Sequence, residues 1–224
     1  MMTRMMPHLV RLIFLPVVWI EMSSGQYALI IIESLSCFAD KQSNLVLDIL
    51  NGQIPHENEK FPEGELNFAG AGWRGFYHCH ASVGKNPNEH GHFHLFVHCN
   101  AKQGNSSNWT HVAALSIDNE GQPRSWFTVN QWVTGANWLS ADETITLLDG
   151  IQIPDEANVT EKFLLAMLGL YHDDLEKLLL ERDRQLTRIN ADRKMDDTLC
   201  DRNVYMLSQQ SIELQQRLNL AVMA

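Results

Sequence analysis

The chain has 224 residues, of which 45% are apolar and 20% are charged, values typical of a globular domain rather than a disordered or membrane-embedded chain. The formal net charge of −10 argues against nucleic acid as a partner, because phosphate binding requires clustered Lys and Arg. The four cysteines are widely spaced and include no Cys-x-x-Cys pair. This spacing argues against a zinc ribbon and favours buried thiols in a reducing cytosol, although Cys79 and Cys99 could meet across neighbouring strands.

The N-terminal segment combines two arginines with a short apolar run, residues 12–20, and small residues follow from Ser23. This is the outline of a secretory signal, and the run is too short for a transmembrane helix. The alternative is that Met22 is the true start of the protein. We interpret residues 1–26 as a signal-like or extraneous extension, of which residues 1–21 should not contact the core. The expected location is cytoplasmic, or exported if the signal is real.

A helix is predicted at residues 27–50, because apolar residues recur there at spacings of three and four. Asn51-Gly52 should end it, since Gly readily adopts the left-handed conformation that follows a helix. Residues 53–71 contain two prolines and two glycines. They are predicted to form a loop that passes over the surface or the sheet edge.

Four strands are predicted next, separated by connections rich in Gly, Asn, Pro or Asp. They span residues 73–82, 90–99, 110–117 and 125–133. Short connections between successive strands imply antiparallel neighbours and therefore a meander. Odd-numbered positions of the first two strands are apolar, so they should face a core covered by helices. The even-numbered face should be partly roofed by residues 53–71 and 134–140.

Six of the ten histidines lie on these first two strands, all at even-numbered positions. They are His78, His80, His90, His92, His94 and His98. Strand side chains alternate, and a single core face requires both apolar sets to point the same way, so the histidines should share one face. If Ser82 pairs with His90, then His80 lies opposite His92 and His78 opposite His94. Such neighbours are about 4.5–5.5 Å apart at Cβ.

This convergence predicts a metal site made of His78, His80, His92 and His94, with His90 and His98 nearby. Imidazole suits a divalent transition metal such as Zn or Fe, and spacing alone does not choose between them. Two alternatives stay open. The face could form a metal-free catalytic or anion-binding site, or it could be a polar sheet surface with hydrogen-bonded histidines.

Other polar side chains are expected to join the histidine face. Phe127, Val129 and Val133 suit the core, which would place Thr128, Asn130 and Trp132 with the histidines. Arg74 lies ahead of His78 on the same face. If the protein is an enzyme with a small-molecule substrate, Arg74 would hold an anionic group and Asn130 would orient it. Glu89 is the nearest candidate carboxylate ligand, at the entrance of the second strand.

The remaining chain is predicted to be helical. Ser140 with Glu143 is a capping-box signature for a helix through Leu148, and a long helix should run over residues 160–192. A last helix is predicted from about residue 199. Its apolar positions repeat roughly in heptads, at Val204, Leu207, Leu214 and Leu218. This stripe should pack in a helical hairpin or across a homodimer seam.

A local resemblance covers seven residues. The run from His90 to Phe96 follows the spacing His-x-His-x-His-x-x and resembles the motif of histidine-triad nucleotide hydrolases and transferases, and the preceding Asn-Pro-Asn-Glu is similar to the loop before that motif. The resemblance implies that His92 is a nucleophile that attacks an α-phosphate without a metal. Gly91, however, stands where that family has an apolar residue. The motif also lies early in this chain, whereas that family places it late in the domain.

A broader resemblance extends over residues 27–190. The chain resembles an uncharacterised bacterial family, a domain of unknown function, in six segments. These are VLDILNGQ, FPEGE, YHCH, EHGHFHLF, FTVNQWVTG and ERD, which begin at residues 46, 61, 77, 89, 127 and 181. The resemblance implies a bacterial, mostly cytosolic protein and names no activity. It begins near residue 27, which favours Met22 as the start.

Taken together, the patterns predict a single α+β domain over residues 27–192, an antiparallel β-meander with helices on one face. Residues 193–224 should add a C-terminal helix, in a hairpin or a homodimer. The expected function is binding of a divalent transition metal by the histidine face, and the protein could be a metalloenzyme. A histidine-triad-like nucleotidyl or phosphoryl transferase and a non-enzymatic interaction module are the alternatives. Neither nucleic acid nor a membrane is an expected partner.

Overall fold

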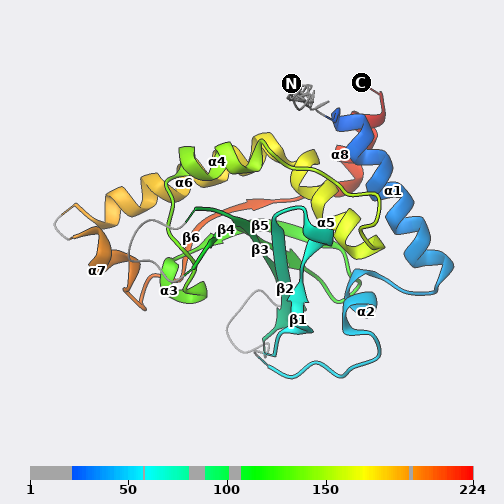
Figure 1. Cartoon of the computed structure of the whole chain (residues 1–224), viewed down its shortest axis with the longest axis horizontal. Helices are drawn as coiled ribbons and strands as arrows, with labels where there is room; N and C mark the ends of the chain where they lie inside the picture. Colours follow the sequence, from blue (N-terminus) through cyan, green and yellow to red (C-terminus); the bar gives the residue numbers. More distant parts are fainter. Residues whose placement is uncertain (1–21, 58, 81–88, 101–106, 192–193, 224) are drawn as a thin grey trace, which may run out of the picture.

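Six antiparallel strands form one sheet in chain order (Figure 1). The computed structural model describes residues 22–57, 59–80, 89–100, 107–191 and 194–223. The strands are β1 (Phe61–Leu66), β2 (Trp73–Cys79), β3 (Gly91–His98), β4 (Trp109–Ile117), β5 (Pro123–Val129) and β6 (Met206–Ser211). Strands β2 to β5 coincide with the four that alternation predicts, and their antiparallel pairing confirms the meander.

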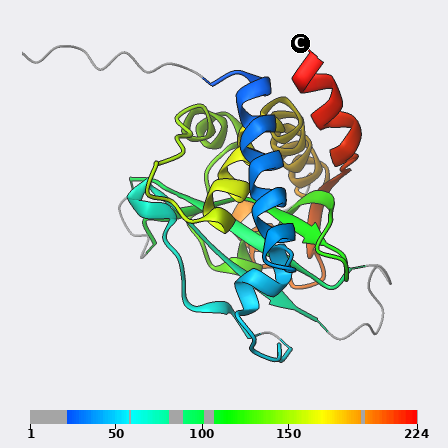
Figure 2. The ribbon, with the colours of Figure 1, turned by 90° about the vertical axis from the view of Figure 1, so that its right-hand side faces the viewer.

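Helices cover the sheet mainly on one side, which confirms the α+β class (Figure 1). The helical elements are α1 (Ser24–Asp40), α2 (Leu45–Leu50), the 3-10 helix η1 (Phe68–Gly70), α3 (Gln131–Thr134), α4 (Ala141–Leu148), α5 (Val159–Leu170), α6 (His172–Ile189), α7 (Met195–Leu199) and α8 (Leu214–Met223). Figure 2 shows α1 and α8 side by side, as their mutual contacts require. No helix within the described ranges is long and apolar enough to cross a membrane.

The first predicted helix is two helices. Ser23 caps α1 in a capping box with Gln26, and the helix ends at Asp40. Gln42 then takes a left-handed φ of 52°, and Asn44 caps α2 through a hydrogen bond from the backbone N–H of Leu47. The turn between them therefore interrupts a stripe that is continuous in sequence. The expectation that residues 1–21 do not contact the core concerns residues outside the described ranges.

Strand β1 lies within the stretch predicted to be a loop. It pairs with β2 through Phe61 opposite Tyr77 and Leu66 opposite Gly75, with a register shift between the two pairs. Gly64 and Glu65 have φ values of 88° and 66° within this shift. The bulge and the embedded Pro and Gly remove the alternation by which a strand is predicted.

The odd-numbered face of β2 and β3 carries the main core. Trp73, Tyr77, Phe93 and Leu95 are buried there against apolar side chains of α1, α5, α6 and α8. The predicted assignment of odd positions to the core is thus confirmed for these two strands. The other face bears three smaller apolar clusters, one of which joins Phe76 and Phe96 to Ala136.

The C-terminal third differs from its prediction in two ways. The long helix breaks at Tyr171 into α5 and α6, because Tyr171 leaves the helical conformation with φ −105° and ψ 20°. The last predicted helix is wrong in its first half, since residues 206–211 form β6, which pairs with β5 and completes the sheet, whereas α8 lies within its second half. Polar residues fill this edge strand, so its sequence lacks the apolar alternation of a central strand.

The apolar stripe of the C-terminus is nevertheless covered within the chain. Leu207 on β6 packs with Leu186 of α6, and Val204 lies beside them. Leu214 and Leu218 on α8 join the main core. The four residues with heptad spacing therefore do not lie on one helix. They belong to a loop, a strand and a helix, which bury their apolar side chains against different neighbours.

Candidate metal centre

Three histidines from two neighbouring strands form the candidate site. His78 on β2 pairs directly with His92 on β3, while His94 pairs with Phe76. The register is two residues away from the predicted one, which had His78 opposite His94. Because a shift of two preserves the alternation, the predicted side-chain face is still the observed one.

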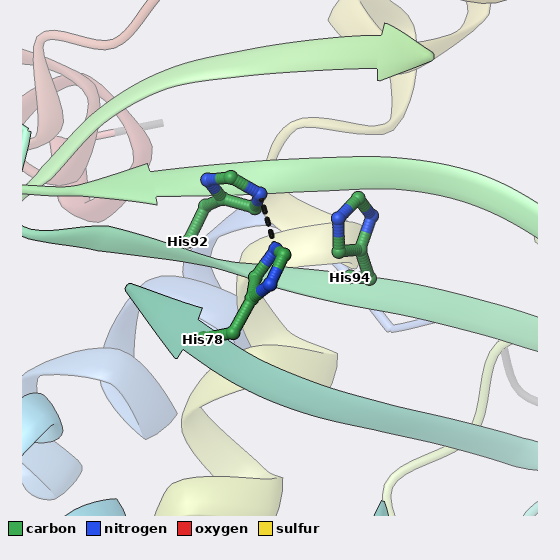
Figure 3. Close-up of side chains that lie close together, drawn as sticks. All are labelled: His78, His92 and His94. Carbon is green, nitrogen blue, oxygen red and sulfur yellow. Dashed lines mark hydrogen bonds between the residues drawn. The ribbon is translucent and has the colours of Figure 1, made fainter. Parts of the chain in front are cut away.

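The imidazoles of His78 and His92 are in contact, and that of His94 lies beside them (Figure 3). Nε2 of His78 lies 2.7 Å from Nε2 of His92, and the three residues each offer a nitrogen within 4.8 Å of the others. Tetrahedral ligands with metal–nitrogen bonds of 2.0–2.1 Å are about 3.4 Å apart. The separation between His78 and His92 is shorter than that value and the others are at most 4.8 Å, so modest rotations of the rings would bring all three nitrogens to ligand distance.

Glu89 fixes the orientation of His92. Its Oε1 lies 2.8 Å from Nδ1 of His92, and the hydroxyl of Ser116 donates a hydrogen bond of 2.7 Å to Oε2. Burial raises the pKa of Glu89, but the hydrogen bonds from His92 and Ser116 outweigh it and hold that pKa below its ordinary value. The ionised carboxylate can only accept, so Nδ1 of His92 carries the proton and Nε2 keeps the lone pair that a metal needs.

His111 on β4 contacts the other side of the cluster. Its Nε2 lies 3.0 Å from Nδ1 of His94, which leaves Nε2 of His94 as the nitrogen available to a metal. Burial, together with the positive charges of the neighbouring histidines, lowers the pKa of His94 well below its usual value. Burial, and then the charge of Arg182, lowers the pKa of His111 to about 3. Both rings are therefore neutral near pH 7, the form in which imidazole binds metals.

The other predicted histidines occupy three different environments. The ring of His80 lies 4.5 Å from that of His78 and 5.2 Å from that of His92, so it borders the cluster without belonging to the three-nitrogen group. His90 instead stacks on Tyr77 and bonds its hydroxyl. His98 is exposed and rests edge-on against Trp109.

Arg74 and Asn130 are not brought to the three histidines. The guanidinium of Arg74 stacks on Phe96 and Trp109 and pairs with Glu65 at 3.5 Å, at the far end of the same face. The amide of Asn130 donates to the carbonyl of Thr198 at 2.9 Å and to two further carbonyls, which anchors the segment that leads into β6.

The predicted orientation of β5 is wrong. Phe127 pairs with Ala114 and its ring lies 5.0 Å from that of His92, so it faces the histidines rather than the main core. Thr128 points the opposite way, where its hydroxyl bonds that of Ser208 at 2.6 Å. Trp132 follows the strand on α3 and donates to the carbonyl of Val204. Both faces of β5 are buried, so its apolar residues do not reveal which one meets the helices.

The site is enclosed by aromatic side chains. His92 and His94 are only 2% and 1% exposed, while His78 is half-buried. The rings of Phe76 and Phe127 pack against the imidazoles. Three imidazole nitrogens in such surroundings suit Zn²⁺ or Fe²⁺, and three protein ligands leave at least one coordination position for a further ligand.

All four cysteines are free thiols and none belongs to the histidine group. Glu89 and His111 bond to the histidines through contacts that alternation did not predict. Glu89 was noted for its proximity, whereas His111 carries no signal of its own in the sequence.

Comparisons with known proteins place the chain in a family. No curated protein and no solved structure gives a significant match. One family model matches residues 26–212, most of the chain and every strand of the sheet. The chain therefore belongs to the family described as Domain of unknown function (DUF6969).

Proposed function

We propose that the protein binds a divalent transition metal through the Nε2 atoms of His78, His92 and His94. The observation that carries this proposal is the meeting of three imidazoles on a buried sheet face with a carboxylate behind one of them. Metal-bound histidines almost always give their second ring nitrogen to such an acceptor. Glu89 holds that position relative to His92.

The burial of the cluster supports the same proposal. An imidazole removed from water loses hydrogen bonds unless other groups replace them. Here Nε2 of His78 contacts Nε2 of His92 at 2.7 Å, and a bound ion would replace this contact with two stronger metal bonds. An ion with a free coordination position would polarise a substrate carbonyl or activate water. His80, at the edge of the cluster, is the nearest further side chain that could complete the ligand set.

Calorimetric titration of tag-free protein with Zn²⁺ or Co²⁺ tests the proposal. Replacing His92 or His94 by Ala should weaken binding about 10-fold or more, because each removes one ligand bond. His98→Ala is the matched control on the same strand, since that side chain is exposed and outside the cluster. Because burial holds the pKa of His94 well below its usual value, protonation of this ligand should weaken binding only in clearly acidic solution.

Equal affinities in the wild type, His92→Ala and His94→Ala would contradict a metal role for this face. The same histidines would then act without a metal. A nucleotide-dependent covalent adduct on His92 would be the sign of the histidine-triad alternative.

A further inference from the structure

His111 reaches the histidine face through an irregularity in β4. His94 pairs with Ala114, so even-numbered residues of β4 face the histidines at that point. The register then shifts: Leu95 pairs with Ala113, but Phe96 pairs with His111. An extra residue, Val112, is thus accommodated on β4, and beyond it odd-numbered side chains take the histidine face. Bulges of this kind are frequent beside functional sites, where they re-aim a side chain.

The re-aimed ring makes one specific polar contact. Nε2 of His111 lies 3.0 Å from Nδ1 of His94, with ring planes inclined at 58°. Both residues are buried, and the edge of Phe96 packs against the His111 ring at 5.2 Å between centroids. Without the bulge, Val112 would occupy this position and Nδ1 of His94 would face an apolar side chain.

We infer that His111 is a positioning residue that accepts the Nδ1–H of His94 and so selects the tautomer whose Nε2 is free for a metal. The opposite arrangement, with His111 donating, would leave a proton on Nε2 of His94, which must leave before that atom can bind a metal. His111 would then do for His94 what Glu89 does for His92, with a neutral ring in place of a carboxylate. The direction of this hydrogen bond and its consequence for metal affinity both rest on the proposed function, but the tautomer of His94 can be measured in metal-free protein.

Nitrogen-15 NMR of the histidine rings in metal-free wild-type protein tests the tautomer directly. The expected result is a proton on Nδ1 of His94 and a bare Nε2. In His111→Phe, which keeps an aromatic ring but has no acceptor, His94 should shift toward the tautomer protonated at Nε2. A wild-type His94 protonated at Nε2, or an unchanged tautomer in a folded His111→Phe protein, would overturn the inference.

Metal titration of two variants tests the consequence. His111→Phe should bind Co²⁺ about 10- to 100-fold more weakly, the usual effect of losing a group that orients a ligand. His111→Gln retains an acceptor oxygen and should stay within about threefold of the wild type. His98→Phe and His98→Gln are the matched controls and should bind as the wild type does. If His111→Phe misfolds, the positioning role of His111 is still tested by the tautomer of His94 in the wild type and by the metal affinity of His111→Gln.

The outcomes separate the two proposals. A wild type that binds no metal but has His94 protonated at Nδ1 would overturn the metal function and support the positioning role. A wild type that binds metal, with His111→Phe within about threefold and an unchanged Co²⁺ absorption spectrum, would overturn the positioning role alone.

Discussion

At Phe93 and His94, the two faces of strand β3 are almost equally buried and yet differ in chemistry. On one face, Phe93 is 0% exposed and packs among helices; on the other, His94 is 1% exposed and packs among imidazoles and phenyl rings. The first face gains stability from the removal of apolar surface from water. The second must recover the hydrogen bonds that its polar rings lose on burial.

The difference shows how a polar layer can be built into a sheet. The Glu89 carboxylate, the Ser116 hydroxyl and the His111 ring supply the partners that water would otherwise provide. Because these partners come from β4 and from the entrance to β3, the histidine face depends on strand register more than the apolar face does. Substitutions on the apolar face should therefore change mainly the overall stability, whereas those on the histidine face should change its dependence on pH.

The largest expected effect is on the apolar face. Phe93→Ala should lower the free energy of unfolding by about 3–5 kcal/mol, since it removes a fully buried ring and leaves a cavity. Denaturant unfolding measures it, with the smaller truncation Phe93→Leu as the control. A loss below about 1 kcal/mol would mean that the face can collapse around the cavity or is not the main core.

A smaller effect is expected at Gly91, the first residue of β3. A Cβ at this position would collide with the carbonyl oxygen of His78 and the hydroxyl of Tyr77. Gly91→Ala should therefore cost about 1–3 kcal/mol through overpacking, measured as a lower melting temperature. Gly150→Ala is the matched control, because its added Cβ would meet its nearest neighbour at an ordinary 3.5 Å. Equal melting temperatures of the wild type and Gly91→Ala would show that Tyr77 and β2 can move to accommodate the added methyl group without strain.

The smallest effect is a pH dependence confined to the histidine face. The pKa values of His94 and His111 are lowered by burial, so the unfolded chain takes up protons below pH 6.5 that the folded protein does not. Stability is therefore present above that pH and falls as the pH drops. Each ring should contribute a loss of roughly 0.8 kcal/mol between pH 7.5 and pH 6.

Denaturant unfolding of metal-free protein at the two pH values measures this loss of stability. The loss should be smaller in His111→Gln, because that variant lacks the contribution of the His111 ring. If the wild type and His111→Gln lose the same stability over that interval, His111 is not held neutral by the fold.

The contrast between the faces also explains what could be predicted from the sequence. Apolar residues at odd positions of β2 and β3 were sufficient to place His78, His92 and His94 together, because alternation survives a register error of two. The same logic failed on β5, where both faces are buried and Phe127 lies on the histidine side. It also missed His111, because a bulge reverses the alternation within β4.

The edge strands were missed for a related reason. Strand β1 is interrupted by Pro62 and Gly64, and β6 is largely polar. Neither carries the apolar alternation that burial on a central strand imposes. Contacts with β2 and β5 stabilise them instead, and such long-range pairing leaves little trace in the local sequence.

If His78, His92 and His94 together hold one metal ion, the metal content of the protein should show it. Elemental analysis would compare tag-free protein that has been loaded with Zn²⁺ or Fe²⁺ and then dialysed with the double variant His92→Ala/His94→Ala. We predict about one ion per chain in the wild type and a marked loss in the folded variant. Equal metal content in the two proteins, or none in a correctly folded wild type, would contradict it.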